Sequence, residues 1–219
     1  MKASEVFLES LAIRDNLKKN NDSADNPIDD SLNPIPPYKV SDEIKLIILG
    51  QDPTVKIPTS RKNIKITLNM DKKGTLRNYL SKICSGLGIA YENVYATNVI
   101  KYFYKEPPAK TPNVLVAHLR TNLDLLVKEL KDYKHIPIIA LGQPVLQLLT
   151  DSENEVKNYW SYNKKTKKTD GVFDYCKAKD NELVRDFFPF PHQPSLRKEF
   201  YKNTLDDYIM FVKNKSSIK

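Results

Sequence analysis

Three residues whose side chains suit work on a small polar ring lie in or directly after strand-like runs of this sequence. Asp52 lies in the stretch GQDPT, directly after the apolar run 44–49. Asn98 lies in the run VYATNVI (94–100), and His192 ends the run LVRDFFPFPH. A carboxylate can orient a water molecule, an amide can read a hydrogen-bonding edge, and an imidazole can donate to a developing negative charge. Together they predict a site that reads and attacks a polar ring.

Each of these residues also has an ordinary structural explanation. An asparagine at the end of a strand often forms a turn, and a histidine after a proline is often structural. An unpaired Asp52 carboxylate, however, would be costly to bury. The carboxyl ends of parallel strands usually open into a ligand crevice, so the elements that carry the three residues decide between the explanations.

The surrounding runs predict a parallel sheet covered by helices. Three apolar β-prone runs and a weaker fourth alternate with segments of helical periodicity, and strands that are apolar throughout are typical of sheets covered on both faces. We predict an α/β fold in three layers, α/β/α, with a central, mainly parallel four-stranded sheet. In such a sheet Asp52, Asn98 and His192 would converge on the carboxyl edge. The predicted strands span 44–50, 94–100, 135–142 and 183–192, and the predicted helices span 4–19, 76–87, 112–130, 144–149 and 195–213.

The charge balance favours a polyanionic partner. The 219 residues include 35 Lys and Arg against 27 Asp and Glu, a formal net charge of +8. Such an excess suits nucleic acid or an acidic surface, although a generic solubilising charge is the alternative. Hydrophobic residues make up 40% of the chain, which is enough for the core of one domain. We therefore expect a single domain over 1–219 and a monomer.

The sequence argues against several other classes of protein. Its two cysteines, Cys84 and Cys176, show no pairing pattern. They predict neither a disulfide framework nor a zinc site nor an iron–sulfur cluster, and we expect no metal and no cofactor. The opening MKASEVFLES is too charged for a signal peptide, and no apolar run is long enough to span a membrane. We expect an intracellular, cytoplasmic protein without a membrane partner.

Two segments stand outside the alternating pattern. Residues 1–43 predict a helix and then an extended loop, rich in Asn, Asp, Ser and Pro, that lies across the surface. Residues 151–182 form a lysine-rich insertion with a turn at Asp170-Gly171, for which an exposed hairpin is the simpler interpretation. The alternative is a finger that contacts nucleic-acid phosphates through Lys164, Lys165, Lys167 and Lys168.

The order of the motifs resembles that of the uracil-DNA glycosylase superfamily. In one branch of that family the first motif reads GQDPY and the last reads HPSPL. Here the first reads GQDPT and the last reads HQPSL (192–196). The middle resembles the iron–sulfur branch, with VYATNVIKYF, KEPPAKTP and IIALGQPVLQLL in the same order. The resemblance extends from Ile44 to Phe211.

The sequence also departs from the family pattern. The cysteines that ligate the cluster are missing, with Tyr102 where one is expected, so the resemblance implies no cluster. Leu68 stands where a stacking aromatic residue is expected, and Gln193 and Arg197 differ from the usual last motif. Thr54 replaces the tyrosine of GQDPY. This smaller residue predicts tolerance of 5-substituted uracils, unless another side chain fills the same space.

The resemblance implies a monofunctional glycosylase that hydrolyses the N-glycosidic bond of uracil, or of a related deaminated or 5-substituted pyrimidine, in single- or double-stranded DNA. It implies that Asp52 acts on the water and the sugar, and that His192 acts on the leaving base. Leu196 would fill the space that the flipped base leaves, and a core position in the last helix is its alternative. The implied base contacts are Gln51, Thr54, Leu68 and Asn98, and the implied DNA contacts are Ser195, Leu196, Arg197, Lys164, Lys165, Lys167 and Lys168.

Two other functions stay open at this point. One is a non-catalytic relative that binds nucleic acid, which the replaced aromatic residues favour and the retained Asp52, Asn98 and His192 oppose. The other is a hydrolase of free nucleosides or nucleotides, which would need neither a wedge residue nor a basic surface.

Overall fold

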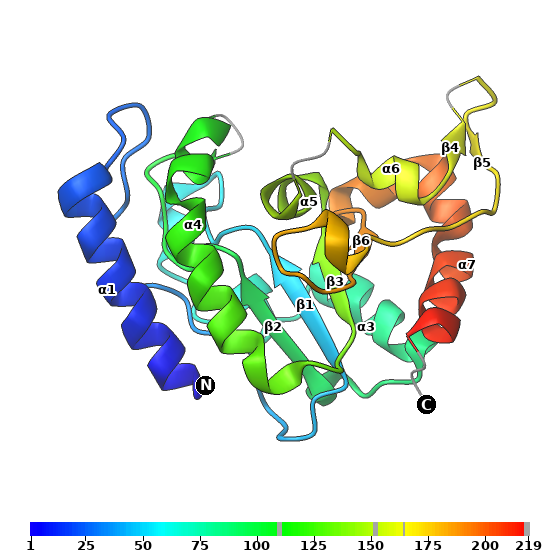
Figure 1. The fold of residues 1–219 in the computed structure, drawn as a ribbon, viewed down its shortest axis with the longest axis horizontal. Helices are drawn as coiled ribbons and strands as arrows, with labels where there is room; N and C mark the ends of the chain where they lie inside the picture. Colours follow the sequence, from blue (N-terminus) through cyan, green and yellow to red (C-terminus); the bar gives the residue numbers. More distant parts are fainter. Residues whose placement is uncertain (109–110, 151–152, 164, 217–219) are drawn as a thin grey trace. The chain divides into compact units, whose positions relative to one another are not determined.

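The central sheet has four strands. The computed structural model describes residues 1–108, 111–150, 153–163 and 165–216. Its main sheet has the order β2-β1-β3-β6, and the pairs β1–β3 and β3–β6 are parallel (Figure 1). Every residue of these strands is buried, as a parallel sheet covered by helices requires. The predicted α/β class with a central four-stranded parallel sheet is confirmed. The strands are β1 (Leu46–Gly50), β2 (Val94–Asn98), β3 (Ile138–Leu141) and β6 (Phe188–Phe190).

The helices begin and end close to the predicted positions, with one exception described below. Proline at the first turn starts α4, and Gly88 in the left-handed region (φ 74°) ends α3. The helices are α1 (Ala3–Asn21), α2 (Pro58–Arg61), α3 (Thr75–Leu87), α4 (Pro112–Glu129), α5 (Gln143–Leu149), α6 (Val156–Tyr159) and α7 (Glu199–Lys215). No helix of the described ranges is long and apolar enough to cross a membrane.

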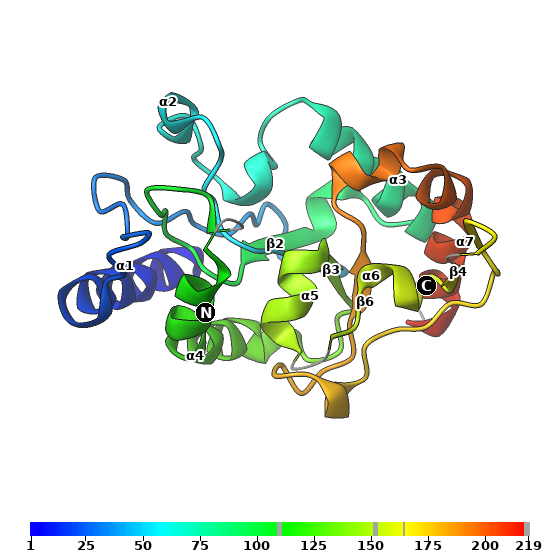
Figure 2. The ribbon, with the colours of Figure 1, turned by 90° about the horizontal axis from the view of Figure 1, so that it is seen from above.

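The chain divides into two compact units. The first contains residues 1–39, 50–71 and 96–135, and the second contains residues 40–49, 72–95 and 136–219. In the first unit α1 packs against α4, and both views show them side by side (Figures 1 and 2). In the second unit α3 packs against α7, and α5 packs against β3.

The loop after α1 contributes to the core of the first unit, so the expectation that it lies across the surface is only partly met. Ile28 is fully buried and Ile35 is 5% exposed. Ile28 bridges to Tyr104, and Tyr38 bridges to Ala96, each in an antiparallel pairing. The apolar residues spaced along this polar segment fix its path.

The insertion is partly a hairpin and partly core. Strands β4 (Tyr162–Asn163) and β5 (Lys168–Thr169) pair antiparallel, and the hairpin turns at 165–167. The chain also bends at Gly171 (φ 72°), so the turn predicted at Asp170-Gly171 is present but follows the hairpin. Trp160, directly before the hairpin, is fully buried and donates its indole N–H to the carbonyl of Pro189 at 3.1 Å. The indole therefore anchors the insertion to β6.

The predicted start of the last helix at Ser195 is also wrong. Residues Gln193–Arg197 form a separate 3-10 helix, η6, and α7 begins at Glu199. Lys198 between them has an extended backbone (φ −71°, ψ 129°), which interrupts the helical hydrogen bonds. The residues that the HQPSL motif places in a helix therefore form their own turn.

Candidate active site

Asp52 lies in the turn after β1, where it is partly exposed to solvent. The backbone N–H of Thr54 donates to Asp52 Oδ1 at 2.7 Å. Burial raises the pKa of the Asp52 carboxyl to about 6, and the hydrogen bonds from Thr54 and the charge of Arg61 oppose that rise. The carboxyl is therefore ionised at pH 7 but gains a proton only slightly below it. A carboxylate of this kind can act as a base near neutral pH.

Asn98 lies against the same turn, with its amide oxygen directly over Gly50. Asn98 is 2% exposed, and its Oδ1 is a buried acceptor that has no hydrogen-bond partner among the described residues. A Cβ added to Gly50 would approach this oxygen to 2.3 Å, so only glycine fits there. The N–H groups of Val99 and Ile100 donate to the carbonyls of Gly50 and Gln51 at 2.8 and 2.9 Å. Backbone bonds thus join the turn of Asp52 to the end of the strand that carries Asn98.

The backbone carbonyl of Asn98 is bonded to one member of a buried ion pair. Lys101 is 1% exposed, and its ammonium donates to the Asn98 carbonyl at 2.8 Å. The same ammonium lies 2.9 Å from Oε2 of Glu129, which is fully buried at the end of α4. Burying two charges is costly unless they pair closely, and here the pair fixes the backbone of Asn98.

Leu68 packs beside Asn98 in a strained backbone conformation. Its Cδ2 lies 2.8 Å from the position that a Gly50 Cβ would take. Leu68 and Asn69 both have positive φ, 57° and 49°, which non-glycine residues rarely adopt and which is common near functional sites. The preceding Thr67 is fully buried and donates its hydroxyl to the carbonyl of Pro36 at 3.0 Å, which holds the strained turn in place.

Thr54 has a structural bond in addition to its contact with Asp52. Its hydroxyl oxygen accepts the backbone N–H of Tyr104 at 2.9 Å. The threonine therefore ties the Asp52 turn to the loop after β2. Tolerance of 5-substituted bases through its small size stays a prediction.

His192 follows β6 in the second unit. The hydroxyl of Tyr79 donates to the carbonyl of the preceding Pro191 at 3.0 Å. Gly142 packs beside His192, since a Cβ added to Gly142 would lie 3.1 Å from His192 Cβ. The residue lies at the surface, but burial of part of the ring lowers the pKa of His192 below its ordinary value, so the imidazole is neutral at pH 7.

The predicted DNA-contacting residues of the second unit lie in two places. Ser195, Leu196 and Arg197 lie in η6. The Ser195 N–H donates to the carbonyl of His192 at 2.8 Å. A contact between Ser195 and a DNA phosphate stays a prediction. On the hairpin, Lys165, Lys167 and Lys168 are exposed, and Lys164 lies outside the described residues. The ring of Tyr162 stacks on Phe200 of α7 at 4.1 Å between centroids, which fixes the hairpin beside that helix.

The structure brings the predicted residues together in two groups. The first unit assembles the base-contacting set with Asp52, and the second unit holds His192 with η6; the meeting of the two groups at one edge stays a prediction. Arg61, Lys101 and Glu129, which support the first group, were not predicted. The signal for Lys101 is a single lysine inside the apolar run 99–104, because a buried lysine requires an acidic partner. In the described ranges no group of three or more His, Cys, Asp or Glu is placed to hold a metal ion.

The α/β sheet has a carboxylate, Asp52, and an amide, Asn98, at the ends of the neighbouring strands β1 and β2, which is where ligand sites of parallel α/β proteins usually form. Residues 37–211 match the Uracil DNA glycosylase superfamily. The match spans most of the chain, and the protein belongs to that superfamily. No curated protein matches this chain.

Proposed function

We propose that this protein is a monofunctional DNA glycosylase, which hydrolyses the N-glycosidic bond of uracil or of a related deaminated or 5-substituted pyrimidine in DNA. Membership of the superfamily supports the reaction class. The single observation that carries the substrate is the buried Asn98 Oδ1, an acceptor without a protein partner. A buried acceptor of this kind costs stability unless a ligand supplies the missing donor.

Uracil matches an asparagine amide at its N3–H and O4 edge. The N3–H would donate to Asn98 Oδ1, and the amide N–H would donate to O4. Cytosine presents an acceptor at N3 and a donor at C4, which would leave the buried amide unpaired. Sites that bond a substrate in this way reject the mismatched analogue by large factors.

Asp52 would act on the sugar side of the bond. Its Oδ1 accepts the Thr54 N–H, which leaves the other carboxylate oxygen to hold the attacking water. The ionised carboxylate would also stabilise the positive charge that develops on the sugar. His192 would act on the leaving base as a neutral imidazole whose N–H donates to the developing oxyanion, in keeping with its lowered pKa.

The target base would have to leave the stack before it can reach these groups. Unstacking costs a few kcal/mol, roughly, and less for a mispaired base. Leu196 would occupy the space that the base leaves, and the exposed hairpin lysines would contact phosphates.

A gel assay for abasic sites tests this proposal. Oligonucleotides with one uracil, single-stranded and paired with guanine or adenine, are incubated with the protein and then cleaved by alkali. We expect the native protein to give strand cleavage at the uracil, and we expect Asp52→Asn to abolish that cleavage. Cleavage of free deoxyuridine with no reaction on DNA would identify a nucleoside hydrolase instead. Binding of DNA without any cleavage would identify a non-catalytic relative.

A further inference from the structure

The segment that follows Asp52 is the most uniformly basic part of its unit. Residues 53–70 contain Lys56, Arg61, Lys62 and Lys65 and no Asp or Glu. The segment therefore contributes +4 of the formal net charge of +8, although it makes up less than a tenth of the 219 residues. A single-sign segment of this kind attracts polyanions.

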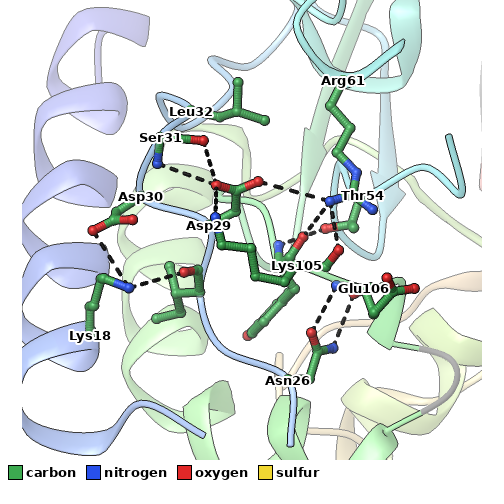
Figure 3. Close-up of polar contacts among 12 residues, drawn as sticks. Lys18, Asn26, Asp29, Asp30, Ser31, Leu32, Thr54, Arg61, Lys105 and Glu106 are labelled. Atoms are coloured by element: carbon green, nitrogen blue, oxygen red, sulfur yellow. Dashed lines mark hydrogen bonds and ion pairs between the residues drawn. The ribbon is translucent and has the colours of Figure 1, made fainter. Parts of the chain in front are cut away.

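Arg61 is the buried member of this set, and it closes a loop that we call the arch, residues 55–62. Arg61 is 2% exposed. Its Nε donates to the carbonyl of Val55 at 3.0 Å, so the side chain spans the arch from its last turn to its first residue. Its Nη1 donates to the carbonyls of Tyr104 and Lys105 at 2.9 and 2.8 Å (Figure 3).

Asp29 balances the buried charge beneath the arch. Its Oδ2 lies 3.9 Å from Arg61 Nη1, and its Oδ1 accepts the ammonium of Lys105 at 2.8 Å (Figure 3). The pKa of Asp29 is lowered because its contacts with Lys105 and Ser31 outweigh the opposing effect of burial. The arch is thus fixed to the loop after β2 by bonds that do not involve its outer surface.

The outer surface of the arch has both charge and apolar contact area. Lys56 and Lys62 are exposed, and Ile57 between them is 60% exposed. Among the described residues neither lysine has an ion-pair partner. An isolated surface isoleucine is ordinary, but one that lies between two unpaired lysines on a fixed loop offers a nucleic-acid strand both phosphate and sugar contacts.

We propose that the arch is a nucleic-acid backbone contact, in which Lys56 and Lys62 neutralise phosphates and Ile57 packs against a sugar or base edge. This inference rests on the proposed action on DNA. Because Arg61 already holds the loop, little conformational entropy is lost on binding. The arch begins one residue after Thr54, which binds Asp52, so a strand held on the arch is also positioned relative to the carboxylate.

Binding measurements on catalytically inert protein test the arch separately from the chemistry. In an Asp52→Asn background, Lys56→Ser/Lys62→Ser is compared with Lys131→Ser/Lys134→Ser, a matched pair of exposed lysines from the same unit. Affinity for a labelled uracil-containing duplex is measured by anisotropy over a range of salt. We expect the arch pair to weaken binding roughly tenfold and to reduce the slope of log Kd against log salt by about two, with little change for the control pair.

The apolar contact has its own variant. Ile57→Ser is expected to weaken binding roughly threefold without changing the salt slope, because it removes no charge. Val116→Ser, at a residue 67% exposed on α4, is the matched control. An unchanged salt slope for the arch pair, or an equal loss from the control lysines, overturns the proposal. If the native protein shows no glycosylase activity but the arch pair still weakens DNA binding, the proposed function is overturned and the arch proposal stands.

Discussion

The two groups of candidate catalytic residues are held in different ways. In the first unit Asn98 and Lys101 are 2% and 1% exposed, and side-chain bonds from Thr54 and Lys101 tie the turn and strand end together. In the second unit His192 is exposed, and among the described residues its side chain makes no hydrogen bond. In the proposed reaction the first group would therefore be preorganised, whereas the second group would be able to adjust when DNA binds.

A glycine adjoins each group and shows the same contrast. At Gly50 an added Cβ would come within 2.3 Å of Asn98 Oδ1, a contact that buried neighbours cannot relieve. At Gly142 an added Cβ would lie 3.1 Å from His192 Cβ, which a few tenths of an ångström would relieve. The comparison therefore predicts that small changes cost more activity in the first unit than in the second.

The largest expected effect comes from Asp52→Asn. Removing a base that acts mainly in the transition state should lower kcat by about a thousandfold and leave DNA binding intact. Single-turnover excision of uracil checks this, and a near-native rate would exclude Asp52 as the catalytic carboxylate. In the native protein the rate should fall as the pH drops through about 6, where Asp52 gains its proton.

The same substitution should raise thermal stability at neutral pH. Because the folded protein raises the pKa of Asp52 from 3.8 to about 6, its contribution to stability is greatest below pH 3.8 and is lost as the pH rises through 6. The melting temperature of Asp52→Asn should therefore exceed that of the native protein above pH 6, and the gap should close near pH 4. A gap that is constant with pH would contradict the raised pKa.

Lys101→Met is expected to be the most destabilising change in the first unit. It leaves the buried Glu129 carboxylate without its ammonium partner, which typically costs about 3–5 kcal/mol. Urea unfolding measures this loss. In Lys101→Met/Glu129→Leu both charges are removed, and stability should return close to the native value.

The double variant separates positioning from stability. Because the Asn98 carbonyl would still lack its Lys101 donor, uracil excision should stay below the native rate although the protein is stable. Preference for uracil over cytosine should fall as well. Native rate and native selectivity in the double variant would mean that the ion pair serves folding alone.

A matched pair of alanine variants tests the glycine comparison directly. Gly50→Ala should displace the Asn98 amide and lower the excision rate roughly a hundredfold, since small misplacements in a site can cost that much. Gly142→Ala should lower stability, because φ is +90° there, but should lower the rate of the folded enzyme less than about tenfold. Equal rate losses would refute the contrast between the two units.

The sequence predicted the strands and long helices better than it predicted the buried residues that support the candidate site. Apolar runs and helical periodicity located the strands and long helices, because burial on a sheet or helix face is a local pattern. The Asp52 turn and Asn98 followed from strand ends for the same reason. The roles of Lys101 and Arg61 depend on partners 28 and 32 residues away, at Glu129 and Asp29, and no local pattern contains such pairs.

The errors in the second unit have a similar cause. The periodicity of the last helix includes Leu196, but it does not show that Lys198 adopts an extended backbone and separates η6 from α7. The insertion bends at Gly171, but its hairpin turns earlier, at 165–167, and Trp160 beside the hairpin bonds to Pro189, a contact that the local sequence does not contain. In both cases a tertiary contact or a single backbone angle overrides a local preference.

The smallest expected effect concerns Leu196, which the separate η6 turn leaves partly exposed rather than in the core. Only a duplex requires the partner strand to be separated from the flipped base, so Leu196→Ala should slow excision from paired DNA roughly tenfold and from single strands hardly at all. The comparison uses rates on both substrates together with the melting temperature, and Val184→Ala, at an exposed residue of the same unit, is the control. Because the Leu196 side chain is not buried in the core, the melting temperature of Leu196→Ala should equal that of the native protein. Equal losses on both substrates together with a lower melting temperature would show that Leu196 is a core residue. In that case η6 would be as rigid as the turn that carries Asp52.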